Sequence, residues 1–286
     1  MRQVHGLSED GSRIVLHHFG GGVQCDPIRD DEATHVLLVV DVETTGLDPN
    51  VDRMIEFAAA ELRYTDDGRI VEHLGTHGWL EDPGRPLPPE ITEITGLTDA
   101  ELKGKRIPPR AEELLEDADL IVSHNAAFDW AFTRHRWPDA VDEKVWACSL
   151  KQIDWIGLGF PVAKQELLTM FHGFFYDAHR AETDVEALVR LLQMRPEPDA
   201  PTYLKQLLDY QKEARYRVLA VGTPFAAKDD LKRRGYNWDA ERRVWWSTAR
   251  ESEIQAERQW LGELYRQYQC RASPVVQKID PRQQWA

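Results

Sequence analysis

The chain has 286 residues, of which 42% are hydrophobic and 29% are charged, with a formal net charge of −14. This composition is that of a globular protein with room for one full domain and a smaller one, and not that of a fibrous or disordered chain. No stretch approaches the ~20 apolar residues of a membrane span, the amino-terminal residues lack a signal-peptide core and the three cysteines lie far apart, so we expect a cytoplasmic protein without a membrane partner.

The first predicted elements are β-strands that follow an amino-terminal extension, residues 1–34. Three segments rich in apolar and β-branched residues, at 36–42, 54–64 and 70–80, are separated by the turn-like sequences DPNVD and TDDG. Links this short predict that consecutive strands are antiparallel neighbours.

Helices and strands alternate through the rest of the first domain. Helices are expected within LPPEITEITGLT and at 111–118, 126–135, 164–171 and 181–194, and strands at 119–125 and 144–148. Three antiparallel strands followed by this alternation predict an α/β domain, residues 35–195, with a mixed five-stranded sheet flanked by helices.

A second, smaller domain is expected after a proline-rich linker at residues 196–202. Residues 203–286 read as helix, strand, helix, hairpin and helix, a small, basic, Trp-rich α+β domain. Residues 201–286 carry 16 Lys and Arg against 11 Asp and Glu, a net charge of +5, whereas the remaining residues carry −19. This asymmetry is typical of a nucleic-acid-facing appendage, although a solvated helical surface would give the same sum.

Two carboxylates interrupt the most apolar strand, HVLLVVDVETTG. Asp41 and Glu43 are two residues apart, so both project from the same face of the strand. Like charges that close repel each other, and burial adds to the cost. A hard divalent cation such as Mg²⁺ or Mn²⁺ removes both problems. Taken alone, the pair fits better a strand end that reaches solvent, where two acids cost little.

A third carboxylate, Asp129 in HNAAFDW, falls in the first turn of the helix after the fourth strand. Such junctions lie at the carboxyl edge of a sheet, where α/β sites form. An acidic residue favoured by the helix dipole is the alternative.

The helix of HRAETDVEALVRLL carries a fourth carboxylate on its apolar side. At ~100° per residue, Asp184 falls beside Ala181 and Leu188 within the apolar stripe. A buried carboxylate needs a cation or a proton. His179 lies in the loop just before this helix, where a side chain with a pKa near neutrality can take a proton from water. An ordinary loop histidine is the alternative.

These segments together resemble the DnaQ-like, DEDD-type 3′-to-5′ exonucleases, in the branch whose last motif carries histidine. The resemblance covers about residues 35–195 and rests on DVETTG, ITEITGLT, HNAAFD and HRAETD. It implies an RNase H-like fold and two Mg²⁺ or Mn²⁺ ions held by Asp41, Glu43, Asp129 and Asp184. It also implies that His179 deprotonates the attacking water. The residues that it places near the terminal nucleotide are Thr44, Thr45, Leu47, Asn125 and Phe128, of which Phe128 fits core packing equally well.

The carboxy-terminal sequence PFAAKDDLKRRGYNWDAERRVWW mixes basic and aromatic residues. Basic side chains can follow phosphates and aromatic rings can stack on unpaired bases. A domain this small also needs large side chains for its own core. We therefore expect most of the tryptophans to be core, and the basic helix face, with Lys232, Arg233 and Arg234, to contact nucleic acid.

The sequence thus predicts a metal-dependent 3′–5′ exonuclease that releases nucleoside monophosphates, with single-stranded DNA as the favoured substrate. An enzyme that trims RNA 3′ ends or degrades oligoribonucleotides is the alternative, because the 2′-hydroxyl decides between them and no residue reports on it. A non-catalytic nucleic-acid-binding accessory subunit is the alternative of another class, and the intact set of site residues argues against it. Protein partners are not indicated.

Overall fold

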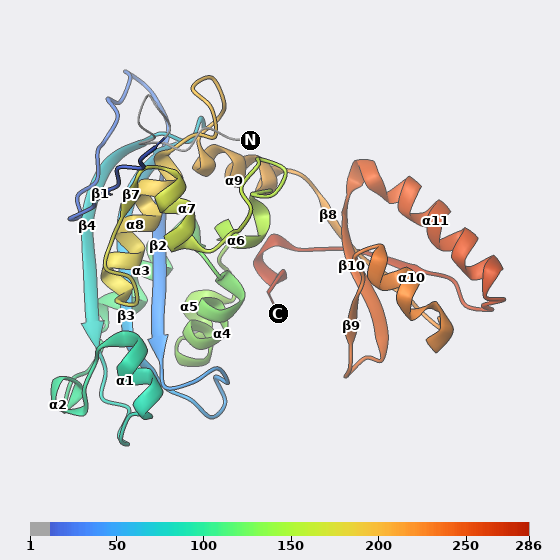
Figure 1. Ribbon diagram of the computed structural model, residues 1–286, viewed down its shortest axis with the longest axis horizontal. Helices are drawn as coiled ribbons and strands as arrows, with labels where there is room; N and C mark the ends of the chain where they lie inside the picture. Colours follow the sequence, from blue (N-terminus) through green and yellow to red (C-terminus); the bar gives the residue numbers. More distant parts are fainter. Residues whose placement is uncertain (1–11, 286) are drawn as a thin grey trace. The chain divides into compact units, whose positions relative to one another are not determined.

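Two compact units make up residues 12–285, the part of the chain that the computed structural model describes (Figure 1). The first comprises residues 12–210 together with Trp285, and the second comprises residues 211–284. Each unit has its own sheet and its own hydrophobic core. Residues 1–11 of the predicted amino-terminal extension lie outside the described residues.

The first unit is built on a mixed five-stranded sheet with the strand order β4-β3-β2-β5-β6. Its strands are β2 (Thr34–Thr44), β3 (Met54–Thr65), β4 (Ile70–Leu80), β5 (Leu120–Ser123) and β6 (Trp146–Cys148). The first three pair antiparallel, and β5 and β6 are added parallel to β2. The predicted fold class is confirmed, and β2 is its central strand, which is why its sequence is so apolar.

Helices cover both faces of this sheet. On one face lie α7 (Gln165–Phe171), α8 (Ala181–Gln193) and α9 (Tyr203–Lys212), and on the other α3 (Arg110–Asp117), α4 (Ala126–Arg136) and α5 (Pro138–Val141). Side chains alternate along β2, so Leu37 and Val39 pack with α8 whereas Leu38 and Val40 pack with α3 and α4. The connections contain α1 (Pro89–Thr95), α2 (Asp99–Leu102) and α6 (Ser149–Gln152). Within residues 12–285, no helix combines the length and apolar character of a membrane span.

Helix α9, which the sequence placed at the start of the second domain, packs into the core of the first unit. Tyr203, Leu204 and Leu207 are fully buried there. The ring of Tyr203 lies 4.6 Å from that of Trp155, and its hydroxyl lies 2.9 Å from Nε2 of His172. The division between the units therefore falls in the last turn of this helix, between residues 210 and 211, and not at the proline-rich segment. Proline marks a turn but does not decide which core the next helix joins.

Part of the predicted amino-terminal extension is paired with the first unit. Strand β1 (His17–His18) lies parallel to β7 (Phe174–Phe175), just before the loop that carries His179. The ring of Phe19 packs edge-on against that of Phe174, with centroids 5.6 Å apart. Residues 17–19 therefore fix the strand that leads into this loop.

The second unit has a four-stranded antiparallel sheet in the order β11-β8-β10-β9, as the prediction of a small α+β domain requires. Its elements are β8 (Arg215–Ala220), η1 (Phe225–Ala227), α10 (Lys228–Arg233), β9 (Asn237–Asp239), β10 (Val244–Arg250), η2 (Glu251–Glu253), α11 (Ile254–Gln267), β11 (Val275–Lys278) and η3 (Pro281–Gln283). Trp245 and Tyr236 are buried in its core with Leu261, whereas Trp238 is 49% exposed. Strand β11 was not foreseen from the sequence.

Candidate active site

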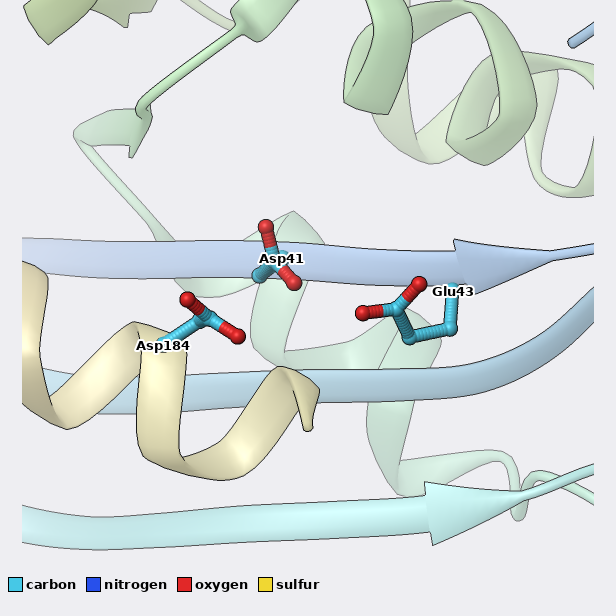
Figure 2. A group of neighbouring side chains, drawn as sticks. All are labelled: Asp41, Glu43 and Asp184. Atoms are coloured by element: carbon cyan, nitrogen blue, oxygen red, sulfur yellow. The ribbon is translucent and has the colours of Figure 1, made fainter. Parts of the chain in front are cut away.

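Three of the four predicted metal ligands meet between β2 and α8. Asp41 and Glu43 continue the side of β2 that carries Leu37 and Val39, so they point toward α8, from which Asp184 projects (Figure 2). One carboxylate oxygen from each of the three lies within 4.8 Å of the others, and all three side chains are half-buried. The apolar stripe of α8 thus aims its carboxylate at the sheet, as its position in the stripe predicted.

Hydrogen bonds fix both oxygens of the Asp184 carboxylate. The Tyr176 hydroxyl donates to Oδ1 over 2.7 Å, and the backbone N–H of His179 donates to Oδ2 over 2.8 Å. Gln165, at the start of α7, donates from Nε2 to the Tyr176 hydroxyl and to the Asp184 carbonyl, each over 2.9 Å. Sequence reasoning missed Gln165 and Tyr176, because nothing in their local sequence separates them from ordinary core residues.

Asp129 lies close to the three carboxylates without joining their group. It is in the first turn of α4, is 2% exposed and accepts a hydrogen bond from the backbone N–H of Val42 over 3.2 Å. Its carboxylate therefore rests against the stretch of β2 between Asp41 and Glu43.

The pKa values of these acids are raised because burial disfavours their charged forms and neighbouring carboxylates repel one another. Burial, reinforced by Asp129 and Asp184, raises the pKa of Asp41 well above its usual range. Burial also raises the pKa of Glu43 to about 8 and that of Asp129 to about 8. Hard oxygen donors that repel one another in a half-buried recess fit a divalent cation, which would offset their charge in place of protons.

His179 is anchored to this cluster by its backbone and to α7 by its side chain. Its φ of 69° lies in the left-handed region, and its N–H is the group that binds Asp184. The imidazole Nε2 lies 3.1 Å from Oε1 of Glu166, and the side chain is 47% exposed. The predicted histidine therefore stands beside the carboxylates, with a partner that the sequence did not reveal.

Glu56 and Arg180 tie the start of α8 to the sheet. Glu56, on β3 opposite Glu43, is almost fully buried and accepts hydrogen bonds from Arg180 Nη2 over 3.2 Å and from the Ala181 N–H over 3.3 Å. These bonds fix the first turn of α8, which carries Asp184. The signal that could have identified Glu56 is an acid between the apolar residues at the start of the strand MIEFAAAEL.

The residues predicted to contact the terminal nucleotide differ in how exposed their side chains are. Leu47 is 85% exposed, and Asn125 is exposed at the start of α4. Thr44 and Thr45 are buried, and the ring of Phe128 packs against that of Phe132, with centroids 5.0 Å apart. The Thr45 hydroxyl donates to Asp52 and accepts hydrogen bonds from the backbone N–H of Arg53 and the side chain of Arg85.

The three basic residues predicted to contact nucleic acid in the second unit do not form an unpaired basic surface. Arg233 forms an ion pair with Asp230, and Arg234 forms one with Glu257 at 2.8 Å while lying over the Trp260 ring. Lys232 is exposed. The positive charge counted in the sequence is therefore offset locally at two of the three positions.

Comparison with known proteins identifies the class of this fold and then the family. A solved structure of exonuclease I, 17% identical in sequence, superposes with a TM-score of 0.51 and covers 85% of this chain and 64% of its own. The two proteins thus share a fold. A family model described as RNase_T: Exonuclease matches residues 38–192, more than half of the chain. The chain belongs to this exonuclease family, and its resemblance to DnaQ-like exonucleases is confirmed.

The curated relatives are much longer proteins. The PolC-type DNA polymerase III of Thermotoga petrophila is 37% identical over 129 residues, which cover 44% of this chain and 8% of the relative. That of Streptococcus pyogenes serotype M3 is 31% identical over 227 residues, covering 74% of this chain and 14% of the relative. The chain thus spans only a small part of the length of the relatives it matches.

Proposed function

We propose that this protein is a metal-dependent 3′–5′ exonuclease that hydrolyses the terminal phosphodiester bond of single-stranded DNA and releases nucleoside monophosphates. The observation that carries the proposal is the meeting of Asp41, Glu43 and Asp184 in one half-buried recess, beside the loop of His179, in a chain of the exonuclease family. A nucleic-acid-binding scaffold would have no need for repelling carboxylates in such a place.

The residues that would hold two Mg²⁺ or Mn²⁺ ions are the three clustered carboxylates and Asp129. Ions bound there would supply the means to lower the pKa of a water molecule and to stabilise negative charge on the phosphate and the leaving oxygen. Tyr176 and the His179 backbone hold the Asp184 carboxylate in one orientation, and Glu56 and Arg180 hold the helix turn that carries it. Orientation of this kind is what distinguishes a catalytic ligand set from a chance group of acids.

His179 acts as the general base in this proposal. With its Nε2–H donated to Glu166, the imidazole keeps Nδ1 as the acceptor for the proton of the attacking water. The exposure of the side chain allows it to reach the water, while its anchored backbone keeps it next to Asp184.

Glu166→Ala is expected to lower kcat roughly 10–100-fold with little change in KM, because His179 loses the partner that sets its tautomer and orientation. Glu166→Gln should recover much of the rate, since its amide oxygen still accepts from Nε2. Single-turnover rates measure the effect. Lys164→Ala, which removes the other ion-pair partner of Glu166, is the matched control and should leave the rate near that of the unaltered protein. Equal rates for Glu166→Ala and the control would refute this role.

The terminal nucleotide is held, in this proposal, by groups around the loop that follows Glu43. Leu47, as an exposed apolar side chain, would pack against the terminal base, and Asn125 and Phe128 would line the opposite side. Thr44 and Thr45 would act through their backbone N–H groups and by shaping the loop, because their side chains are buried.

The test of the function uses 5′-labelled single-stranded DNA, duplex DNA and RNA, each incubated with Mg²⁺ or with EDTA. We expect a ladder that shortens from the 3′ end, fastest on single-stranded DNA and abolished by EDTA. Faster cleavage of RNA would assign the enzyme to RNA ends instead. Undiminished cleavage in EDTA would overturn the metal mechanism, and binding without any cleavage would favour the accessory-subunit alternative.

A further inference from the structure

A groove runs along the first unit at the end of the sheet where β4 ends. It consists of two adjoining hollows of about 480 Å³ and about 690 Å³, which share Glu81, Asp82 and Arg136. The first is bordered by Arg53, at the start of β3, and by the last turn of α4. The second is bordered by the loop that contains Lys105 and by the start of α3. We name these two hollows together the basic groove.

The charges along the basic groove leave it an excess of free cations. Glu81 is paired with Arg136 at 2.9 Å, and both oxygens of Asp82 accept backbone N–H groups over 2.8 Å. Lys105 and Arg106 are exposed and, within residues 12–285, no carboxylate lies at ion-pair distance from either. Lys103 is also exposed and lies near Asp82, whose pKa is lowered by its two backbone hydrogen bonds and, to a smaller extent, by the charge of Lys103. These cations stand out because residues 1–200 carry a net charge of −19.

We call the carboxylates of Asp41, Glu43 and Asp184 the acidic cluster. One side chain connects the basic groove with the loop next to this cluster. Arg85, in the segment that follows β4, donates from Nη2 to the Thr45 hydroxyl over 2.8 Å and pairs with Asp52 at 3.1 Å. Asp52 and the adjoining Arg53 border the first hollow. Thr45 follows Glu43 by two residues, or roughly 7 Å along an extended strand. The groove therefore begins next to the loop that follows Glu43 and extends from there along the end of the sheet.

We propose that the basic groove binds backbone phosphates of the substrate strand several nucleotides upstream of the 3′ end held at the acidic cluster. A polyanion suits unpaired cations spread along a groove better than a small anion, which would contact only one of them. This inference rests on the proposed function, because it concerns the same DNA strand whose 3′ end that function places at the acidic cluster.

The test compares Lys105→Glu/Arg106→Glu with the control Arg195→Glu/Lys212→Glu, which changes the net charge equally at exposed residues outside the groove. Anisotropy of labelled thymidine strands, a trinucleotide and one of about 20 nucleotides, measures binding in EDTA at several salt concentrations. We expect the groove variant to bind the long strand at least about tenfold more weakly and its salt slope to fall by roughly 1.4, for two lost phosphate contacts. Its cleavage of the trinucleotide with Mg²⁺ should match that of the unaltered protein.

The outcomes separate this inference from the function on which it rests. The proposed role of the groove would be overturned if the groove variant bound the long strand as tightly as the unaltered protein, or lost no more affinity than the control. In either case, cleavage by the unaltered protein would still support the exonuclease function. A loss of trinucleotide cleavage in the groove variant would also overturn it, since the groove would then act at the site itself. Groove-dependent binding without cleavage by the unaltered protein would overturn the exonuclease and leave the groove as a nucleic-acid surface.

Discussion

Asp184→Asn is expected to lower kcat by more than about 100-fold, the upper range for losing an outer partner of a metal site. Asp184 contributes the α8 carboxylate to the three-carboxylate group, so its neutralisation leaves Asp41 and Glu43 on β2 without a facing charge. The amide keeps nearly the same shape and still accepts one hydrogen bond. A lost rate would therefore report on the lost charge and the lost hydrogen-bond acceptor, and not on packing. Initial rates on labelled single-stranded DNA with Mg²⁺ measure the effect.

Glu182→Gln is the matched control for this prediction. It neutralises an exposed acid on the same turn of α8, outside the three-carboxylate group. Its rate should stay within about twofold of that of the unaltered protein, as expected of a surface substitution. If Asp184→Asn cleaved DNA as fast as this control, the three-carboxylate group would not be the catalytic site.

Glu43→Gln is expected to flatten the pH dependence of stability in the metal-free protein. The pKa of Glu43 is raised by folding to about 8, so its contribution to stability is present at low pH and is lost as the pH rises through about 8. The unfolding temperature in EDTA should therefore decrease as the pH is raised from about 5 to about 9. The decrease should be smaller in Glu43→Gln. About 1 kcal/mol corresponds to roughly 2–4 °C in a unit of this size, so a difference of several degrees is expected at the alkaline end.

Adding Mg²⁺ provides the second half of this experiment. A bound cation offsets the repulsion among the ionised carboxylates, so Mg²⁺ should raise the unfolding temperature most at alkaline pH and more in the unaltered protein than in Glu43→Gln. Glu93→Gln, which neutralises an exposed acid on α1, should behave like the unaltered protein. Identical pH curves for all three proteins, with no response to Mg²⁺, would contradict the linkage between charge repulsion and metal binding at this site.

The parts of the site that could be predicted are those governed by local periodicity. The alternation of β2 places Asp41 and Glu43 on one face, and the apolar stripe of α8 places Asp184 toward the sheet, so both facts follow from the sequence. Strand and helix limits follow in the same way, and the predicted strand 70–80 coincides with β4. Each of these inferences depends only on residues within one element.

The parts that could not be predicted depend on contacts between distant segments. Glu166 meets His179 only because α7 folds back beside the loop before α8, and no periodicity within α7 indicates this. Asp129 turns toward the backbone of β2 for the same kind of reason. In the second unit, the net charge counted from the sequence includes Arg234, but the sequence could not show that Arg234 pairs with Glu257.

The parallel pair β1–β7 changes the definition of the smallest fragment that can work as an enzyme. The family match begins at residue 38 and ends at residue 192. A fragment cut at those limits would lack β1, which holds the strand leading to His179, and also α9, whose Tyr203 and Leu207 complete the core beneath α8. The autonomous catalytic module therefore extends beyond the recognisable motifs on both sides, and its boundaries are set by packing partners and not by the residues of the reaction.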